Sequence, residues 1–294
     1  MRLWDGCRRA SVMHSSRTLW SFRYGTDRRT LSGLALAMGP FASSGFAAEC
    51  EDWKQHHPEW LWCDEFESGR ALRETYEDVN TQGISLTDKD AYRGARSLMQ
   101  RYEPGQVTAG WIVKISKSGY PDHVFVRWYH GFGKGYDIFP PKMARIRSRR
   151  RESDWQDNYA VHVWMRGRNP IVDVYAKYSS QANSTGWLPV QVSDFVFDKA
   201  AGKNWMRFEI EIKLNQPGEI DGLYRLWLND DLIVDRVNAD LRGNTQYKIN
   251  EIMLDGYWNG GATGYLERYY DNFVISTRRI GGVKSGGREK KVTP

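Results

Sequence analysis

The sequence predicts an all-β fold, a large antiparallel β-sandwich, on three observations. Short stretches between residues 60 and 276 alternate apolar and polar side chains, which is the pattern of half-buried strands. Gly, Pro, Asn and Asp separate these stretches, and few segments have the periodicity of a helix. Hydrophobic residues make up 40% and aromatic residues 14% of the 294-residue chain, so one large core is expected.

Residues 1–48 are predicted to be an export signal with an N-terminal extension. They hold seven arginines and two acids, and residues 31–48 form an uncharged run of small and apolar side chains. A basic region followed by such a run is typical of a cleaved signal peptide. Gly39, Pro40 and Gly45 interrupt the run, which disfavours a membrane span. We expect cleavage near Ala48 and a secreted or periplasmic protein; the alternative is an N-terminal helix packed on the body.

The net charge of +6 belongs mainly to this leader. Without residues 1–48, the totals of 42 Lys plus Arg and 36 Asp plus Glu fall to 35 and 34. A body this close to neutral does not fit a protein that coats nucleic acid. We therefore expect no nucleic-acid partner and no membrane span.

Two cysteines, Cys50 and Cys63, remain after the leader. In an oxidising compartment they can form a disulfide that ties the new N-terminus to the first strand. The alternative is a pair of free buried thiols. The chain has no Cys-x-x-Cys or Cys/His spacing of a zinc site.

The strands follow one another from residue 60 to residue 277. Arg207–Leu214 is the clearest, with Phe208, Ile210 and Ile212 on a dry face and charged residues on a wet one. The other predicted strands are Ser97–Tyr102, Gly110–Ile115, His123–Tyr129, Lys142–Ser148, Tyr159–Arg166, Ile171–Tyr178, Leu223–Asn229, Leu232–Val237, Asn250–Trp258 and Leu266–Thr277.

Turns and short helices complete the prediction. Asn229–Asp231 has the composition of a hairpin connection. Short helices are predicted over Ser68–Glu74 and Asp235–Arg242. The glycine-rich, charged stretch 281–294 is predicted to be a mobile tail, which leaves one domain over residues 49–280.

Five motifs carry a family resemblance. They are the opening CDEFESG, the closing YLERYYDNFVIST, RSLMQRY at Arg96–Tyr102, FPPKMARIRS at Phe139–Ser148 and YAVHVWM at Tyr159–Met165. With the run of strands, they resemble jelly-roll polysaccharide lyases of the concanavalin A-like lectin and glucanase superfamily, the alginate, glucuronan and heparin lyase kind. The resemblance implies an enzyme that cleaves an acidic, uronic-acid polysaccharide by β-elimination. We also expect a monomer that requires no cofactor. The alternative is a non-catalytic carbohydrate-binding or cell-surface module.

β-Elimination needs a group that neutralises the uronate carboxylate, a base and an acid. Strand alternation places His162, Trp164 and Arg166 on one face of Tyr159–Arg166. We predict His162 as the base, with a structural histidine as the alternative. His130, at the end of HVFVRWYH, is a second histidine that we expect in the same groove.

The acid is predicted to be a tyrosine of YLERYYDNF, because the resembling lyases carry a tyrosine on the corresponding strand. Tyr269 and Tyr265 are the candidates, whereas most other tyrosines are expected to be packing residues.

Cationic and polar side chains are expected to bind the substrate. Arginine grips carboxylates bidentately, and arginines are dense over Arg145–Arg151. The alternative for that cluster is a solvated basic loop. The predicted substrate contacts are Arg96, Gln100, His130, Lys142, Arg145, Trp164 and Arg166.

A structural Ca²⁺ is a weaker expectation. The resemblance places the first and last strands together, and Glu65, Glu67 and Asp271 lie on them. Carboxylates are the hard oxygen ligands that Ca²⁺ prefers. The alternative is that these acids are solvated.

Overall fold

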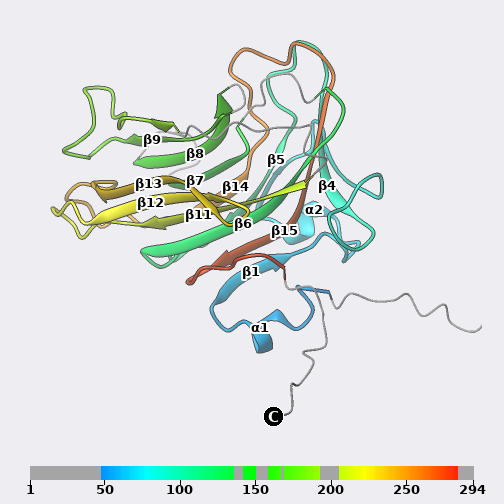
Figure 1. Ribbon diagram of the computed structural model, residues 1–294, viewed down its shortest axis with the longest axis horizontal. Coiled ribbons are helices and arrows are strands. Elements are labelled where there is room, and N and C mark those ends of the chain that lie inside the picture. The colour runs from blue at the N-terminus through cyan, green and yellow to red at the C-terminus, as the bar shows by residue number, and fades with distance from the viewer. Residues whose placement is uncertain (1–47, 136–141, 150–157, 167–168, 193–204, 284–294) are drawn as a thin grey trace, which may run out of the picture. The chain divides into compact units, whose positions relative to one another are not determined.

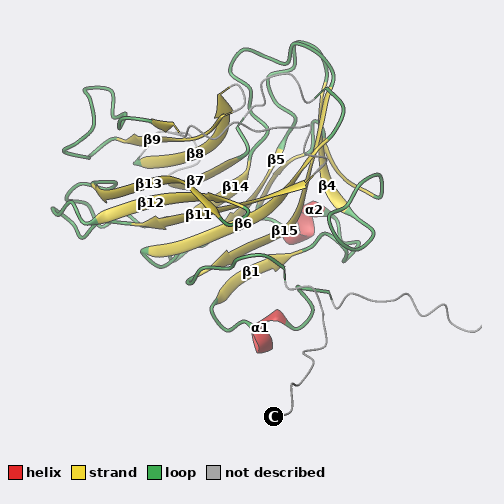
Figure 2. Cartoon of the chain, in the orientation of Figure 1, coloured by secondary structure: helices red, strands yellow, loops and turns green. Residues whose placement is uncertain are grey.

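The computed structural model describes residues 48–135, 142–149, 158–166, 169–192 and 205–283. All of these belong to one compact unit. Its described elements are strands β1 to β15 and two four-residue helices, α1 (Trp53–His56) and α2 (Leu72–Thr75). Figure 1 shows the strands in two layers, and Figure 2 shows how little helix accompanies them.

Sheet A has eight strands in the order β13-β12-β11-β6-β15-β4-β3, with β1 also paired to β15. Its strands are β1 (Trp60–Asp64), β3 (Ile84–Thr87), β4 (Ser97–Tyr102), β6 (His123–Phe132), β11 (Trp205–Lys213), β12 (Gly222–Leu228), β13 (Asp231–Ala239) and β15 (Leu266–Ser276).

Sheet B has seven strands in the order β10-β9-β8-β7-β14-β5-β2. Its strands are β2 (Asp78–Asn80), β5 (Trp111–Ile115), β7 (Ala144–Ser148), β8 (Tyr159–Arg166), β9 (Asn169–Ala176), β10 (Gln191–Val192) and β14 (Glu251–Leu254). Neighbouring strands in both sheets are antiparallel. The predicted antiparallel sandwich is confirmed.

One apolar core fills the space between the sheets. Phe208, Ile210 and Ile212 of β11 face it from sheet A, while Val161 and Val163 of β8 face it from sheet B. Strand alternation then turns the intervening side chains to the outer faces. The outer face of sheet B is therefore built by residues such as Arg145, His162 and Glu251, which are absent from the core cluster.

The outer face of sheet A is more buried than the alternation of apolar and charged residues in β11 predicts. Glu209 is fully buried, and its carboxylate accepts hydrogen bonds from the backbone N–H groups of Ile280 and Gly281. Arg127, also fully buried, binds Glu49 with both terminal nitrogens and the carbonyl of Gly281. The segments around Glu49 and Gly281 thus cover this face, so the predicted wet side of β11 is wrong.

The shorter predictions have mixed outcomes. Cys50 and Cys63 form a disulfide, as predicted. The hairpin is confirmed, because Leu228 pairs with Asp231 across Asn229 and Asp230. The helix over Asp235–Arg242 is wrong, because pairing with β12 keeps β13 extended to Ala239.

The predicted leader and the predicted C-terminal tail are only partly described by the structure. Residues 1–47, with the predicted leader, lie outside the described residues, as do residues 284–294. Gly281–Val283, the start of the predicted mobile tail, is hydrogen-bonded to sheet A through Glu209, Arg127 and Tyr129. No helix of the described part is long and apolar enough to cross a membrane.

Candidate active site

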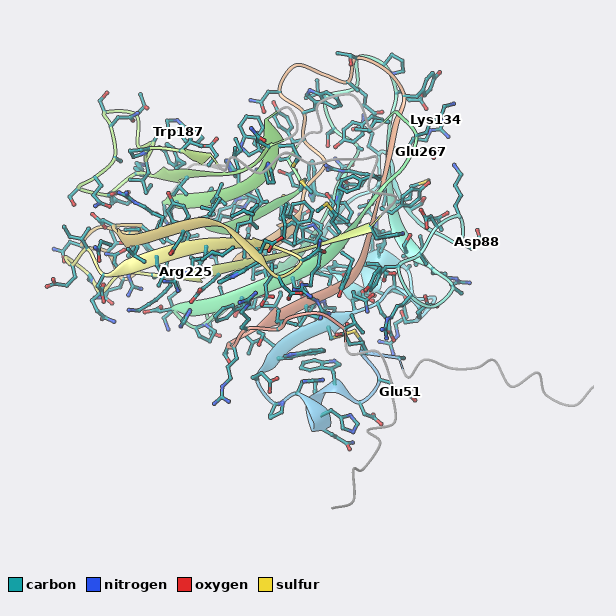
Figure 3. The ribbon with its side chains drawn as sticks, in the orientation of Figure 1. Glu51, Asp88, Lys134, Trp187, Arg225 and Glu267 are labelled. Carbon is teal, nitrogen blue, oxygen red and sulfur yellow. A yellow bond between two sulfur atoms is a disulfide. The ribbon has the colours of Figure 1, made fainter. Side chains whose placement is uncertain are left out.

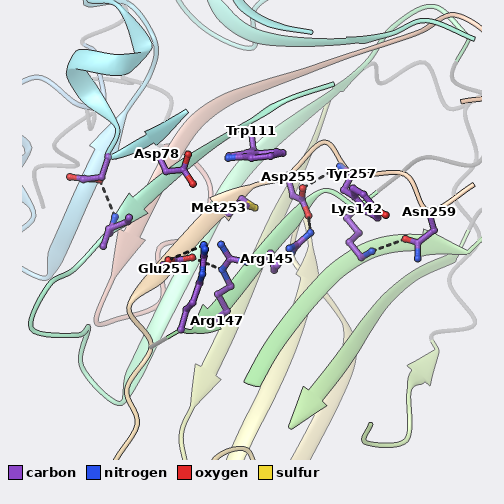
Figure 4. Close-up of a pocket in the computed structure, with 13 residues that line it drawn as sticks. Asp78, Trp111, Lys142, Arg145, Arg147, Glu251, Met253, Asp255, Tyr257 and Asn259 are labelled. Carbon is purple, nitrogen blue, oxygen red and sulfur yellow. Dashed lines mark hydrogen bonds and ion pairs between the residues drawn. The ribbon is translucent and has the colours of Figure 1, made fainter. Parts of the chain in front are cut away.

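A groove of about 730 Å³ lies on the outer face of sheet B. Side chains from β2, β5, β7 and β14 and from the segments that flank them form its wall (Figure 4). The lining residues are Glu77, Asp78, Trp111, Ile115, Lys142, Arg145, Arg147, Arg149, Glu251, Met253, Asp255, Tyr257 and Asn259.

Strand register explains why these side chains meet. Ile252 and Leu254 of β14 are in the core, so Glu251 and Met253 point outward, and Asp255 lines the groove beyond the end of the strand. Met253 pairs with Arg145 on one side and with Val113 on the other, and Val113 in turn pairs with Asp78. One row of paired residues therefore crosses four strands from β2 to β7.

Arginines on β7 and just after it are ion-paired to acids on β14 and just after it. Arg145 binds Asp255 at 2.5 Å, Arg147 binds Glu251 through Nε, and Arg149 lies 3.6 Å from Glu251. The side chain of Asp255 is 1% exposed and that of Arg147 is 4% exposed. These pairs are thus part of the wall, and the solvated basic loop does not describe Arg145 or Arg147. Arg150 and Arg151 lie outside the described residues.

Lys142, Tyr257 and Asn259 form a cluster at one end of the groove. The Lys142 Nζ atom donates to Asn259 Oδ1 at 2.7 Å and lies 4.8 Å from the centroid of the Tyr257 ring. Burial, and next the charge of Arg145, lower the pKa of Lys142 below its ordinary 10.5. Among the described lining residues, Lys142 is the cation that has no ion pair with a carboxylate. Tyr257 is 37% exposed and lines the groove.

His162 lies on the groove side of β8 but below the surface. It pairs with Arg145 on β7 and with Asp173 on β9, and its imidazole is fully buried. Trp187, beside β9 in Figure 3, lies 6.2 Å from it, ring to ring. Burial, followed by the charges of Arg145, Lys142 and Arg147, lowers the pKa of His162 well below 6.5. The imidazole is therefore neutral and adjoins the cationic wall without lining the groove.

Trp164 shares the face of His162, as predicted from alternation, and its half-buried ring does not line the groove. Arg166 is the last residue of β8, and its side chain lies outside what the structure describes.

His130 and Gln100 lie between the sheets, which overturns their expected place in the groove. The His130 ring is fully buried and meets the rings of Phe132, Phe208 and Tyr270 edge-on or tilted. Gln100, also fully buried, accepts a hydrogen bond from Arg268 Nε and donates one to the Gly110 carbonyl. Neither side chain can reach a ligand on the outer face of sheet B.

Three more predicted residues lie on sheet A rather than in the groove. Tyr269 is on its outer face, where its hydroxyl bonds Glu267 and its ring lies 6.3 Å from that of Trp205. Tyr265, just before β15, is 54% exposed and does not line the groove. Arg96 precedes β4, and its backbone N–H donates to Glu67. Tyr269 is thus on a strand of sheet A, and Tyr265 and Arg96 directly precede strands of that sheet. None of the three lines the groove, and their contact with a substrate stays a prediction.

The acids of the predicted calcium site are occupied by backbone N–H groups. Glu67 accepts from Ala95 and Arg96, Asp271 accepts from Tyr92, Arg93 and Asn272, and Glu65 accepts from Cys50. Burial raises the pKa of Asp271 to about 8, and the structural Ca²⁺ stays a prediction. No group of three or more His, Cys, Asp or Glu among the described residues could hold a metal ion.

The sequence reasoning missed Tyr257, Asn259 and Trp111, and also the acids Glu251 and Asp255. A signal for the acids was present, because Glu251, Met253 and Asp255 alternate with Ile252 and Leu254. The other three could not be selected from their own segments, since only the strand order of sheet B brings them together.

Comparison with known families finds a match over part of the chain. The sequence model described as Polysaccharide lyase 14 matches residues 168–273, a stretch that includes β14 and Tyr257. A search of curated protein sequences finds no match.

Solved structures with the same fold include three lyases. The PL-14 alginate lyase from Aplysia kurodai is 14% identical with a TM-score of 0.57, and the match covers 74% of this chain and 99% of that one. The endo-β-1,4-glucuronan lyase from the fungus Trichoderma reesei is 15% identical with a TM-score of 0.54, covering 74% and 96%. An alginate lyase from Chlorella virus is 16% identical with a TM-score of 0.54, covering 76% and 95%.

At this level of identity the likeness shows the fold. The predicted resemblance is confirmed: the chain is a jelly-roll β-sandwich similar to alginate and glucuronan lyases, and part of it matches the polysaccharide lyase 14 family.

Proposed function

We propose that this protein is an exported lyase that cleaves a uronic-acid polysaccharide by β-elimination in the groove of sheet B. The observation that carries the proposal is the cluster of Lys142, Tyr257 and Asn259 next to Arg145, on a lyase-type fold. The cluster supplies the three groups that the reaction needs: a titratable amine, a phenol, and donors for a carboxylate.

Lys142 is the better candidate for the base than His162. A base must reach the C5 proton of the sugar, and Lys142 lines the groove whereas His162 is fully buried. The lowered pKa of Lys142 makes its neutral amine available at a lower pH than for an ordinary lysine. His162 then acts as a neighbour that positions Arg145, with which it pairs across β7 and β8.

The remaining roles follow from what lies beside Lys142. Arg145 has five N–H donors, so it can hold a substrate carboxylate while it keeps Asp255. The Asn259 amide uses its oxygen for Lys142, which leaves its N–H₂ group for the same carboxylate. Tyr257 donates a proton to the departing oxygen as the C4–O bond breaks and the C4–C5 double bond forms.

Lys142→Arg and Tyr257→Phe test these roles. Arginine keeps the positive charge but does not titrate, and phenylalanine keeps the ring but has no proton to donate. Each change should lower turnover by about 10²- to 10⁴-fold, the range of general acid–base catalysis. The assay is the ultraviolet absorbance of unsaturated uronates, released from alginate, glucuronan and heparin-type substrates.

Matched controls lie away from the groove. Lys213→Arg at the end of β11 and Tyr265→Phe before β15 should leave turnover unchanged, because neither side chain lines the groove. The turnover of the wild-type protein should rise with pH with a midpoint below 10.5, as Lys142 loses its proton. Full activity of Lys142→Arg would remove Lys142 as the base. Binding without any unsaturated product would assign the groove to a non-catalytic glycan-binding module.

Export is the second part of the proposal. The Cys50–Cys63 disulfide supports an oxidising compartment, in agreement with the predicted leader. Mass spectrometry of the protein recovered from an expressing bacterium should find a mature chain that begins near Glu49; a retained leader would contradict export.

A further inference from the structure

We propose that the groove selects a heteropolysaccharide in which a uronate is flanked by neutral sugars, rather than a polymer made of uronates alone. This inference rests on the proposed function for the location of the site. It comes from the charges of the described lining residues, which balance along the groove instead of being uniformly positive.

The described lining residues carry four cationic and four anionic side chains. Arg145, Arg147 and Arg149 are ion-paired to Asp255 and Glu251, and the side chains of these two acids are 1% and 11% exposed. Much of the attraction for an anionic polymer is therefore cancelled within the wall. A groove built to hold a row of carboxylates would instead present one unneutralised cation after another.

The end of the groove at β2 is anionic. Glu77 is bound to Lys114 at 2.8 Å, but among the described residues the Asp78 carboxylate has no hydrogen-bond or ion-pair partner. Figure 4 shows Asp78 and Lys142 on opposite sides of the groove. Asp78 is three strands from Arg145 in one paired row, so the two lie about 14 Å apart across the sheet at ~4.8 Å per strand.

This polarity defines two subsites. The Lys142 end provides the Arg145 guanidinium and the Asn259 amide for the carboxylate of one uronate. At the other end, a free carboxylate repels a second uronate but accepts hydrogen bonds from the hydroxyl groups of a neutral sugar. The half-buried Trp111 lies on β5 between them and offers an apolar face to a neutral ring.

The Asp78→Asn variant tests the selectivity. With glucuronan, in which every sugar is a uronate, the change should raise kcat/KM on the order of tenfold at low salt, the effect of removing one partly screened like charge. The gain should shrink as salt is added. With gellan, in which neutral sugars flank every glucuronate on both sides, kcat/KM should stay the same or fall. Asp88→Asn, which removes an exposed carboxylate after β3, should change neither polymer's kcat/KM.

Two results would overturn the inference: equal kcat/KM of the wild-type protein on both polymers, or no response of glucuronan cleavage to Asp78→Asn. Binding to Tyr257→Phe, measured by calorimetry with oligosaccharides of each polymer, separates this inference from the proposed function. Preferential binding of the gellan oligosaccharides without product from any variant would reject the lyase activity and retain the selectivity. Product from both polymers with no preference in binding would retain the activity and reject the selectivity.

Discussion

Burial keeps the two histidines of β6 and β8 neutral, although they lie in different parts of the fold. His130 is buried among aromatic rings between the sheets, and His162 is buried beneath the groove wall. Burial is the main cause that lowers both pKa values well below 6.5, and nearby arginines add to it. Both rings therefore bind a proton less readily in the folded protein than in the unfolded chain, so both make the stability of the fold depend on pH.

This dependence has a definite sign. Below pH 6.5 the unfolded chain binds protons at His130 and His162 while the folded chain does not, so the free energy of unfolding falls as the pH falls. Each group contributes a limiting slope of about 1.4 kcal/mol per pH unit. Urea unfolding between about pH 5 and pH 7 measures the sum of these two slopes and the opposing slope of Asp271, because the raised pKa of its buried carboxyl keeps a proton on the folded chain up to about pH 8.

His130→Met removes one of the two groups. In this variant the free energy of unfolding should change less steeply with pH than in the wild-type protein, by about 1.4 kcal/mol per pH unit. This difference is expected even if the absolute stability also changes. An identical slope in the two proteins would show that His130 takes up its proton in the folded state.

Strand β14 connects the groove to the core. Its inward residues, Ile252 and Leu254, pack in the sandwich, and its outward Glu251 neutralises Arg147 on the next strand. A buried cation that loses its only strong partner is costly, because its desolvation is no longer compensated. The ion pairs of the wall are therefore expected to matter for folding as well as for selectivity.

Glu251→Gln should lower the free energy of unfolding by about 3–5 kcal/mol, because it leaves a buried guanidinium without its carboxylate. The double variant Glu251→Met with Arg147→Met should recover much of that loss, because no charge then remains buried. Asp235→Asn breaks an exposed pair with Arg225 on sheet A (Figure 3) and should cost less than about 1 kcal/mol. Equal losses for Glu251→Gln and Asp235→Asn, measured by urea unfolding, would contradict the buried role.

The local alternation of apolar and polar residues predicted the strands well, because it directly indicates which side chains are buried. The predicted ranges Ser97–Tyr102 and Tyr159–Arg166 coincide with β4 and β8. Alternation could also have predicted that His130 is buried, since this residue shares a face with Val126 and Trp128, both in the core. The placement of His130 in the groove was wrong because large apolar and aromatic residues occupy both faces of β6. The sequence of this strand therefore does not show which face is the core face.

The sequence of a strand does not predict which of the two sheets the strand joins. Tyr269 and Lys142 both lie near strand ends with suitable neighbours, yet β15 joins sheet A whereas Lys142 leads into β7 of sheet B. Sheet order depends on pairings between distant segments, such as β14 with β5 and β7. For that reason the cations of the site were predicted in part, and Tyr257, Asn259 and Asp78 were not.

The disulfide fixes the N-terminal segment to the body of the molecule. Cys50 and Cys63 are 13 residues apart, and closing a loop of this size stabilises a fold by about 3 kcal/mol in the chain-entropy model. The variant with Cys50→Ser and Cys63→Ser should lose about that amount in urea unfolding, and a reducing agent should produce a similar loss in the wild-type protein. No loss in either case would show that the contacts of Glu49 and Trp60 suffice without the bond.

Both ends of the described chain meet on Arg127, at the back of the sandwich. Glu49 and the Gly281 carbonyl bind the same guanidinium on sheet A, whereas the groove opens on the outer face of sheet B. A purification handle or a surface linker joined near either segment would therefore hold the protein by its rear side. An immobilised sample should present its groove to a long, diffusing polymer without obstruction from its own anchor.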